Sequence, residues 1–217
     1  MDSVKKTLRG RISASGGREE VRLEESILPH DLTERIRKGE IRRIFVIGQG
    51  TAAIAAQGIA FLIENALGGF PLSIEATKAA ELSGKVLNKD MSDSIVVAVS
   101  QSGTTTDTNR TVDLVRNRGA YVIAIVNRRN SDLVFKSNSV LYTSDGRDIE
   151  MSVASTKAFY AQNVAGQLLA LALAEALGTM APQELSAECA ALKKLPDILQ
   201  RTLRCASQVA ELAKAHA

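Results

Sequence analysis

Short hydroxyl side chains gather around one glycine in the segment that reads Ser100, Gln101, Ser102, Gly103, Thr104, Thr105. Their hydroxyls can donate hydrogen bonds, and Gly103 lets the backbone approach a ligand closely. This chemistry suits a phosphate monoester. The segment contains no lysine, so it differs from a nucleotide P-loop. Affinity must then come from several hydrogen bonds to a charged acceptor, which predicts a dissociation constant on the order of micromolar to millimolar.

The same residue types also have a purely structural interpretation. Thr104 and Asp107 have the spacing of a capping box at a helix start, and Ser and Thr are common where a strand turns into a helix. Capping accounts for one hydroxyl but not for four. The pattern favours a ligand site and leaves capping open as the alternative.

The flanking elements place this segment where ligands usually bind. The β-branched run 95–99 predicts a buried strand, and the pattern continues with a helix over 105–118 and a second buried strand over 121–126. The hydroxyls would therefore lie at the carboxyl end of a parallel strand, where open α/β sheets bind ligands. The helix start adds free N–H groups and a positive dipole end.

The remaining pattern predicts an α/β fold, a three-layer α/β/α sandwich of the flavodoxin or Rossmann type with a parallel sheet of about five strands. The other expected strands are 44–47, 72–74 and 140–143, and the other expected helices are 31–38, 52–67, 77–82, 155–177 and one from Pro182 that breaks near Pro196. Helix 155–177 is apolar almost all round, which predicts burial. We expect a lead-in segment without a core of its own over 1–40, a binding domain over 41–178 and a helical segment over 179–217.

Composition narrows the function classes. The chain has 217 residues, a net charge of +3 and 4% aromatic residues, a poor basis for nucleic-acid binding. The longest apolar run, 168–174, is too short to span a bilayer, and the N-terminus lacks a signal-peptide core. We expect a soluble cytoplasmic protein. Cys189 and Cys205 lack a metal-ligand spacing and are expected to be reduced thiols.

A dinucleotide-binding loop is the rival interpretation. Gly48, Gly50 and Ala53 fit G-x-G-x-x-A between a strand and a helix, and Glu75 would end the next strand where a ribose-binding acid sits. This short motif is a weak signal, and the hydroxyl segment has no role in a dinucleotide fold. The two histidines lie near the chain ends, which leaves no obvious partner for hydride transfer.

Three motifs together resemble a known family. Residues 47–51, the segment Val99-Ser-Gln-Ser-Gly-x-Thr-x-Asp-Thr108 and the segment Val153-Ala-Ser-Thr-Lys-Ala-Phe159 follow the order and spacing of the sugar isomerase (SIS) domain. The chain is most similar to the first of two such domains in the glutamine–fructose-6-phosphate aminotransferase (isomerising), or glucosamine-6-phosphate synthase, family. Residues 7–12 resemble the segment that introduces its isomerase half.

The resemblance implies roles for particular residues. The sugar phosphate would be held by Ser100, Gln101, Ser102 and Thr105. Thr51 would lie at the pocket edge, and Val153, through its backbone, and Ser155 would face the sugar hydroxyls. Further possible pocket residues are Gly50, Ala52, Gly103 and Glu150. The resemblance implies no metal, no cofactor and no catalytic residue within this chain, because the family's catalytic groups lie in a second SIS domain.

Two departures bear on the substrate. Ala52 stands where the family commonly has Ser, and Thr104 stands where it has Glu. We therefore expect either an isomerase subdomain of an aminotransferase that makes glucosamine 6-phosphate from fructose 6-phosphate and glutamine, or a non-catalytic phosphosugar-sensing or assembly module. In the first case a glutaminase domain and a second SIS domain complete the full-length protein, and the piece alone binds without turnover. Self-association into a homo-oligomer is expected in either case.

Overall fold

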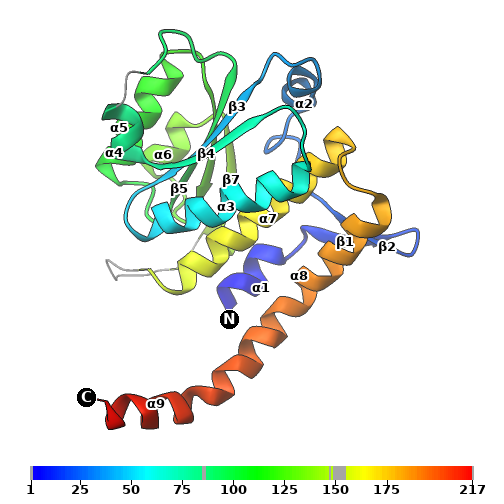
Figure 1. Cartoon of the computed structure of the whole chain (residues 1–217), viewed down its shortest axis with the longest axis vertical. Helices are drawn as coiled ribbons and strands as arrows, with labels where there is room; N and C mark the ends of the chain where they lie inside the picture. The colour runs from blue at the N-terminus through cyan, green and yellow to red at the C-terminus, as the bar shows by residue number, and fades with distance from the viewer. Residues whose placement is uncertain (1, 85–86, 147, 149–154, 217) are drawn as a thin grey trace.

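A five-stranded parallel sheet forms the centre of the protein (Figure 1). The computed structural model describes residues 2–84, 87–146, 148 and 155–216. The strand order is β4-β3-β5-β6-β7. The strands are β3 (Arg43–Gly48), β4 (Ser73–Lys78), β5 (Ser94–Ser100), β6 (Tyr121–Val126) and β7 (Ser139–Tyr142). This confirms the predicted parallel sheet of about five strands.

Helices cover both faces of the sheet, so the predicted three-layer sandwich is confirmed. One face packs against α2 (His30–Arg37), α3 (Thr51–Leu67) and α7 (Lys157–Leu177). The other packs against α4 (Ala79–Gly84), α5 (Thr106–Arg116) and α6 (Asp132–Lys136). Strand β5 is buried along its whole length. Its side chains alternate between the two layers: Val97 faces α3 and α7, and Val96 faces α4 and α5.

The α3–α7 pair packs closely because two glycines lie at the contact. A Cβ on Gly166 of α7 would lie 2.4 Å from Ile59 Cγ1 of α3, and a Cβ on Gly58 would lie 2.4 Å from Asn163 Oδ1. Helix α7 is buried as its composition predicts. It also contacts α1 (Asp2–Leu8) and α8 (Pro182–Thr202).

The segment before residue 41 contributes side chains to the main core. It contains α1, the antiparallel hairpin β1 (Ile12–Ser15) and β2 (Arg18–Val21), and α2. Ile27, Leu32 and Ile36 join the cluster beneath α3. The division of the chain into three parts remains a prediction.

Two predictions about element boundaries are wrong. Helix α8 continues through Pro196 without a break. Pro196 is buried, and its packing offsets the backbone hydrogen bond that proline cannot make. Strand β4 extends to Lys78, four residues beyond the expected end, because its pairing with the whole of β3 outweighs local propensity.

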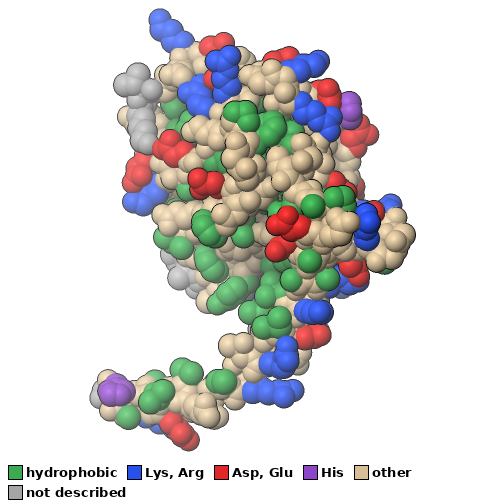
Figure 2. All heavy atoms as spheres, turned by 45° about the vertical axis from the view of Figure 1, so that its right-hand side comes forward, with side chains coloured by type: hydrophobic (Ala, Val, Ile, Leu, Met, Phe, Trp, Pro, Cys, Tyr) green, Lys and Arg blue, Asp and Glu red, His purple; other side chains and the backbone are tan. Residues whose placement is uncertain are grey.

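The C-terminal end of the chain extends away from the body as an arm (Figures 1 and 2). It consists of the end of α8, the 3₁₀ turn η2 (Leu203–Cys205) and α9 (Ala206–Ala215). Residues 201–216 are exposed, including the apolar side chains of Leu203, Val209 and Leu212. Another short 3₁₀ turn, η1 (Ser144–Gly146), follows β7.

Candidate functional site

The hydroxyl segment, residues 100–105, lies at the point where the strand order of the sheet reverses. From β3 the chain crosses to β4 on one side, and from β5 it crosses to β6 and β7 on the other. The loops that leave the carboxyl ends of the paired strands β3 and β5 therefore lead to opposite faces of the sheet. A crevice at such a switch point is the usual binding site of an open α/β sheet. Both candidate loops, 48–51 and 100–105, lie here, and the hydroxyl segment follows the carboxyl end of a parallel strand, as the sequence predicts.

Ser100, the last residue of β5, shapes the loop from within. It is 3% exposed, and its Oγ accepts a hydrogen bond of 2.9 Å from the Gly103 N–H. That bond folds the backbone back on itself. The positive φ of Gly103, 66°, completes the turn. The Ser100 side chain is therefore a positioning group as much as a donor to a ligand.

Ser102 and Thr104 interact with each other on the solvent side of the loop. The Ser102 Oγ accepts hydrogen bonds from the Thr104 N–H at 3.2 Å and from the Thr104 Oγ1 at 3.1 Å. As the acceptor in both bonds, the Ser102 hydroxyl keeps its own proton for a ligand. Helix α5 begins at Thr106 after Thr105, without a side-chain cap. The capping-box alternative is wrong, because Thr104 lies before the N-cap and bonds to Ser102.

The uncapped helix start leaves donors directed at the crevice. The first N–H groups of an α-helix have no partner within the helix, and together they carry a partial positive charge. The hydroxyl of Thr105 lies at the same point and is half-buried. The loop thus combines hydroxyls and backbone N–H groups around one small volume, an arrangement that suits a phosphate group.

Backbone carbonyl oxygens of the loop accept hydrogen bonds from the protein interior, which leaves the loop's donors directed outward. Asn109 Nδ2 donates to the carbonyl oxygens of Gly103 at 3.1 Å and Thr105 at 3.0 Å. The Leu133 N–H donates to Gly103 O at 3.0 Å, and the Arg128 N–H donates to Gln101 O at 3.2 Å. Asn109 was not among the residues predicted from the sequence. An amide in the first turn of a helix that follows a hydroxyl loop is the signal that could have identified it.

Gly103 is required for steric reasons as well. A Cβ at this position would lie 2.0 Å from Ser131 Oγ and 2.6 Å from Ser131 Cβ. Ser131 is itself fixed, since its Oγ donates to Arg128 O at 2.9 Å. The loop can lie this close to the start of α6 only with glycine at residue 103.

The glycine loop after β3 leaves the sheet at the strand end next to that of β5. A Cβ on Gly48 would lie 2.5 Å from Ala52 O, so glycine permits the tight turn into α3. Gly50 is the N-cap residue with φ of 59°. Thr51 opens α3, and Thr51 and Ala52 are both half-buried at its first turn. The site therefore has two helix starts, those of α3 and α5, at adjacent strand ends.

The start of α7 lies next to the hydroxyl segment 100–105, the candidate phosphate loop. A small hollow of about 10 Å³ is lined by residues that include Gln101, Lys157 and Ala158. Ser155 lies two residues before α7 begins and is half-buried. This arrangement brings the Ser155 motif to the same side of the molecule as Gln101. Glu150 and Val153, the other residues expected there, lie outside the described residues.

An ionic link from α1 lies beside this hollow. Asp148 accepts hydrogen bonds from Ser3 Oγ at 2.6 Å and Lys6 Nζ at 2.9 Å. Burial by itself would raise the pKa of Asp148, but the hydrogen bonds from Ser3, Lys6 and Ser144 outweigh it and lower the pKa to about 2. The sequence gives no sign of this link, because residues 3 and 148 are far apart in the chain.

The structure contradicts the placement of a ribose-binding acid. Glu75 pairs with Phe45 in the middle of β4, and the strand continues to Lys78. An acid that binds a ribose must lie at the carboxyl end of its strand. Glu75 lies three residues before that end. The dinucleotide interpretation therefore lacks its ribose-binding acid.

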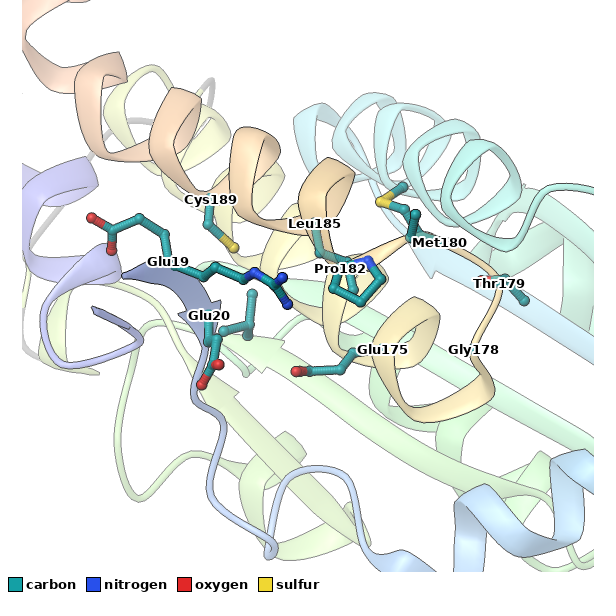
Figure 3. A pocket seen from close by; sticks show the side chains of 12 residues that line it. Glu19, Glu20, Glu175, Gly178, Thr179, Met180, Pro182, Leu185 and Cys189 are labelled. Atoms are coloured by element: carbon teal, nitrogen blue, oxygen red, sulfur yellow. The ribbon is translucent and has the colours of Figure 1, made fainter. Parts of the chain in front are cut away.

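A larger cavity lies away from this site, between the β1–β2 hairpin, α7 and α8 (Figure 3). It has a volume of about 420 Å³, and its lining contains three carboxylates, Glu19, Glu20 and Glu175, and one arginine, Arg18. Burial, with Glu20 nearby, raises the pKa of the Glu175 carboxyl. An acidic cavity of this kind would repel a phosphate group, so it does not compete with the crevice as a phosphate site.

The described part of the chain contains no cluster of His, Cys, Asp or Glu that could hold a metal ion. Within that same part, no helix combines the length and apolarity that a membrane crossing requires.

The fold defines a doubly wound α/β protein with a hydroxyl-rich loop at its topological switch point. Comparison with known families makes this specific: residues 40–172 match the SIS domain, and the chain belongs to that family. The glutamine–fructose-6-phosphate aminotransferase (isomerizing) of Mycobacterium tuberculosis H37Rv is 38% identical over 174 residues, which are 80% of this chain and 27% of the relative. The corresponding Corynebacterium glutamicum enzyme is 34% identical over 214 residues, 98% of this chain and 32% of that protein.

The chain therefore spans about a third or less of these curated relatives. Among solved structures, the C-terminal domain of glucosamine-fructose-6-phosphate aminotransferase from Francisella tularensis has the same fold, with a TM-score of 0.78 and 24% identity. The match covers 97% of this chain and 55% of that one. These similarities agree with the resemblance found in the sequence.

Proposed function

We propose that this chain is the sugar-phosphate-binding isomerase subdomain of a glutamine–fructose-6-phosphate aminotransferase-like enzyme, which converts fructose 6-phosphate and glutamine to glucosamine 6-phosphate. The observation that carries the proposal is the uncapped start of α5 beside the hydroxyls of Ser102 and Thr105. The names of the aminotransferase relatives supply the substrate.

In this proposal the loop binds the phosphate and other groups bind the sugar. The hydroxyls of Ser102 and Thr105 and the N–H groups at the start of α5 donate to the phosphate oxygens. Ser100 and Asn109 hold the loop in shape from within. As the family resemblance implies, Gln101 also holds the phosphate, Thr51 lies at the pocket edge, and Ser155 and the backbone of Val153 face the sugar hydroxyls.

Turnover is assigned to parts outside this chain. Aldose–ketose isomerisation needs a base within hydrogen-bond reach of the transferred proton. The hydroxyl and amide side chains of the phosphate loop are too weakly basic for this role. We therefore infer that the chain alone binds the sugar phosphate and that a second SIS domain and a glutaminase domain complete the reaction.

Calorimetric titration with fructose 6-phosphate and glucosamine 6-phosphate tests the binding role. Ser102→Ala removes one hydrogen bond to a charged group, worth about 1.5–3 kcal/mol, so binding should weaken roughly 10- to 150-fold. Ser207→Ala, on the exposed α9 arm, is the matched control and should bind like the unsubstituted chain. Binding of NAD without binding of either sugar phosphate would refute the proposal, as would equal affinities of the two variants.

A non-catalytic phosphosugar-sensing or assembly module is the second candidate. Two residues favour it: Ala52 brings no hydroxyl to the first turn of α3, and the Thr104 hydroxyl bonds to Ser102. Both leave the phosphate loop intact and change the wall that faces the sugar. Glucosamine 6-phosphate formation from fructose 6-phosphate and glutamine by the full-length protein distinguishes the two. A protein that binds fructose 6-phosphate without turnover would support the sensor.

We also propose that the protein works as a homo-oligomer. Ile54 and Phe61 lie seven residues apart on α3, so they share a helix face, and they are 55% and 62% exposed. Light scattering after size exclusion should give a multiple of the chain mass that Phe61→Asp lowers. Phe135→Asp, at an exposed position of α6, is the control. A monomeric unsubstituted chain would contradict this proposal.

A further inference from the structure

A second polar cavity lies along β7, the edge strand of the sheet, and has about 590 Å³ of space. It is formed by the turn after α1, the segment after β2, β7 itself and the turns that follow β6 and β7. None of residues 100–105 lines it. It is therefore separate from the phosphate loop and is not used by the function proposed above.

Charge sets this cavity apart from the acidic one beside α8. Its lining contains the arginines Arg9, Arg11, Arg22 and Arg129 and only two carboxylates, Glu24 and Asp145. The lining thus has an excess of two positive charges. A concave surface with an excess of one sign of charge raises the local concentration of the opposite ion. The excess matches a doubly charged anion.

Arg129 is held in place with its end groups available. Its guanidinium carbon lies 4.4 Å from the centre of the Tyr142 ring, and its Nε donates to Asp145 O at 3.0 Å. A Cβ on Gly146 would lie 2.7 Å from Arg129 Cγ, so glycine makes room for the stem of the side chain. Within the described part of the chain, Asp145 O is the hydrogen-bond acceptor seen for this guanidinium. Its two terminal nitrogens therefore remain for a bidentate contact with a phosphate group.

Arg11 lies opposite and is half-buried. Its Nη1 donates to Thr7 O at 2.9 Å, and no salt bridge to it occurs among the described residues. Burial lowers the pKa of the Arg11 guanidinium, and the charges of Asp145 and Glu24 offset this only in part. Arg9, by contrast, pairs with Asp145 at 3.3 Å. Arg11 and Arg129 are thus the two cations best placed to gain from an incoming anion.

We propose that this arginine-lined cavity is a second anion site, which binds a small phosphorylated metabolite through Arg11 and Arg129. The two side chains come from segments far apart in the chain, the turn after α1 and the turn after β6. A ligand between them would link the lead-in segment to the sheet edge. Occupancy should therefore stabilise the contact between these two parts of the protein.

Pyrophosphate titration followed by calorimetry tests the proposal. The titration is made in a Ser102→Ala, Thr105→Val background, so that binding at the phosphate loop does not contribute. We expect saturable binding that weakens with added salt and falls about ten-fold or more with Arg129→Gln or with Arg11→Gln. Arg42→Gln, at an exposed arginine outside the cavity, should change affinity less than about two-fold.

Arg129 is exposed, so its substitution should leave the fold intact, and an unchanged circular dichroism spectrum checks this. An absence of saturable binding in the double-substituted background would overturn the proposal. Equal losses of pyrophosphate affinity in Arg42→Gln and Arg129→Gln would also overturn the proposal, because they would indicate a general charge effect. Neither result bears on fructose 6-phosphate binding at the phosphate loop, which Ser102→Ala tests in an otherwise unsubstituted chain.

Discussion

Replacement of Gly103 by alanine should damage the phosphate loop more than any other single methyl group added to it. The residue has φ of 66°, a conformation that costs an alanine about 1–2 kcal/mol. The added Cβ would also lie 2.0 Å from Ser131 Oγ and 2.6 Å from Ser131 Cβ. Overpacking of this kind typically costs about 1–3 kcal/mol, so the free energy of unfolding should fall by about 2–5 kcal/mol.

Urea unfolding followed by circular dichroism measures this loss, and sugar-phosphate titration measures its effect on the site. Gly68→Ala is the matched control, since Gly68 has φ of 50° and a Cβ added there would meet nothing within 4 Å. Gly68→Ala should lower the free energy of unfolding only by the cost of the left-handed conformation, about 1–2 kcal/mol. Equal losses for the two variants would refute the steric argument. Full sugar-phosphate affinity in Gly103→Ala would refute the claim that this turn positions the donors.

Three further predictions concern the body of the protein. The pKa of Asp148 is about 2 in the folded protein, below its ordinary value of 3.8, so its link to α1 stabilises the fold above pH 4 and is lost as the pH falls toward 2. Asp148→Asn should lower the free energy of unfolding by about 2 kcal/mol at pH 7. Urea titrations should show that the difference in unfolding free energy between the two proteins disappears below about pH 3. A difference independent of pH would contradict this prediction. Burial raises the pKa of the Cys189 thiol to about 11. A thiol reagent at pH 8 should therefore label exposed Cys205 and leave Cys189 unmodified until urea unfolds the protein. Rapid labelling of both cysteines in the folded protein would refute this prediction. Gly166→Ala should cost about 1–3 kcal/mol through its clash with Ile59 Cγ1 and Cγ2. In a double-mutant cycle, Ile59→Ala removes both of these carbons and should relieve part of that loss. Strict additivity of the two substitutions would exclude the clash.

The phosphate loop shows how far local sequence determines structure here. The β-branched run of β5 packs alternately into two cores, and this alternation follows from the period of a strand alone. The helix after the loop and the parallel strand β6 follow from hydrophobic spacing. These features were predictable because each depends on residues close together in the chain.

Other features depend on contacts between distant segments. Glu75 lies in the middle of β4 because pairing with β3 extends that strand to Lys78. Asn109 holds the loop only because α5 turns back over the Gly103 carbonyl. The capping-box spacing of Thr104 was misleading for a different reason, since the hydroxyl found a nearer partner in Ser102.

The sequence by itself determined the three-layer α/β/α fold, the hydroxyl segment after β5 and the family, because the period of the strands, the glycine turns and the motifs can be read from the chain without its strand order. Tertiary structure decided which loops share the crevice, that Ser3 meets Asp148 and that Arg11 lines the same cavity as Arg129. These juxtapositions depend on strand order and on the docking of the lead-in segment. Both are set by long-range burial of apolar surface, which no local pattern encodes.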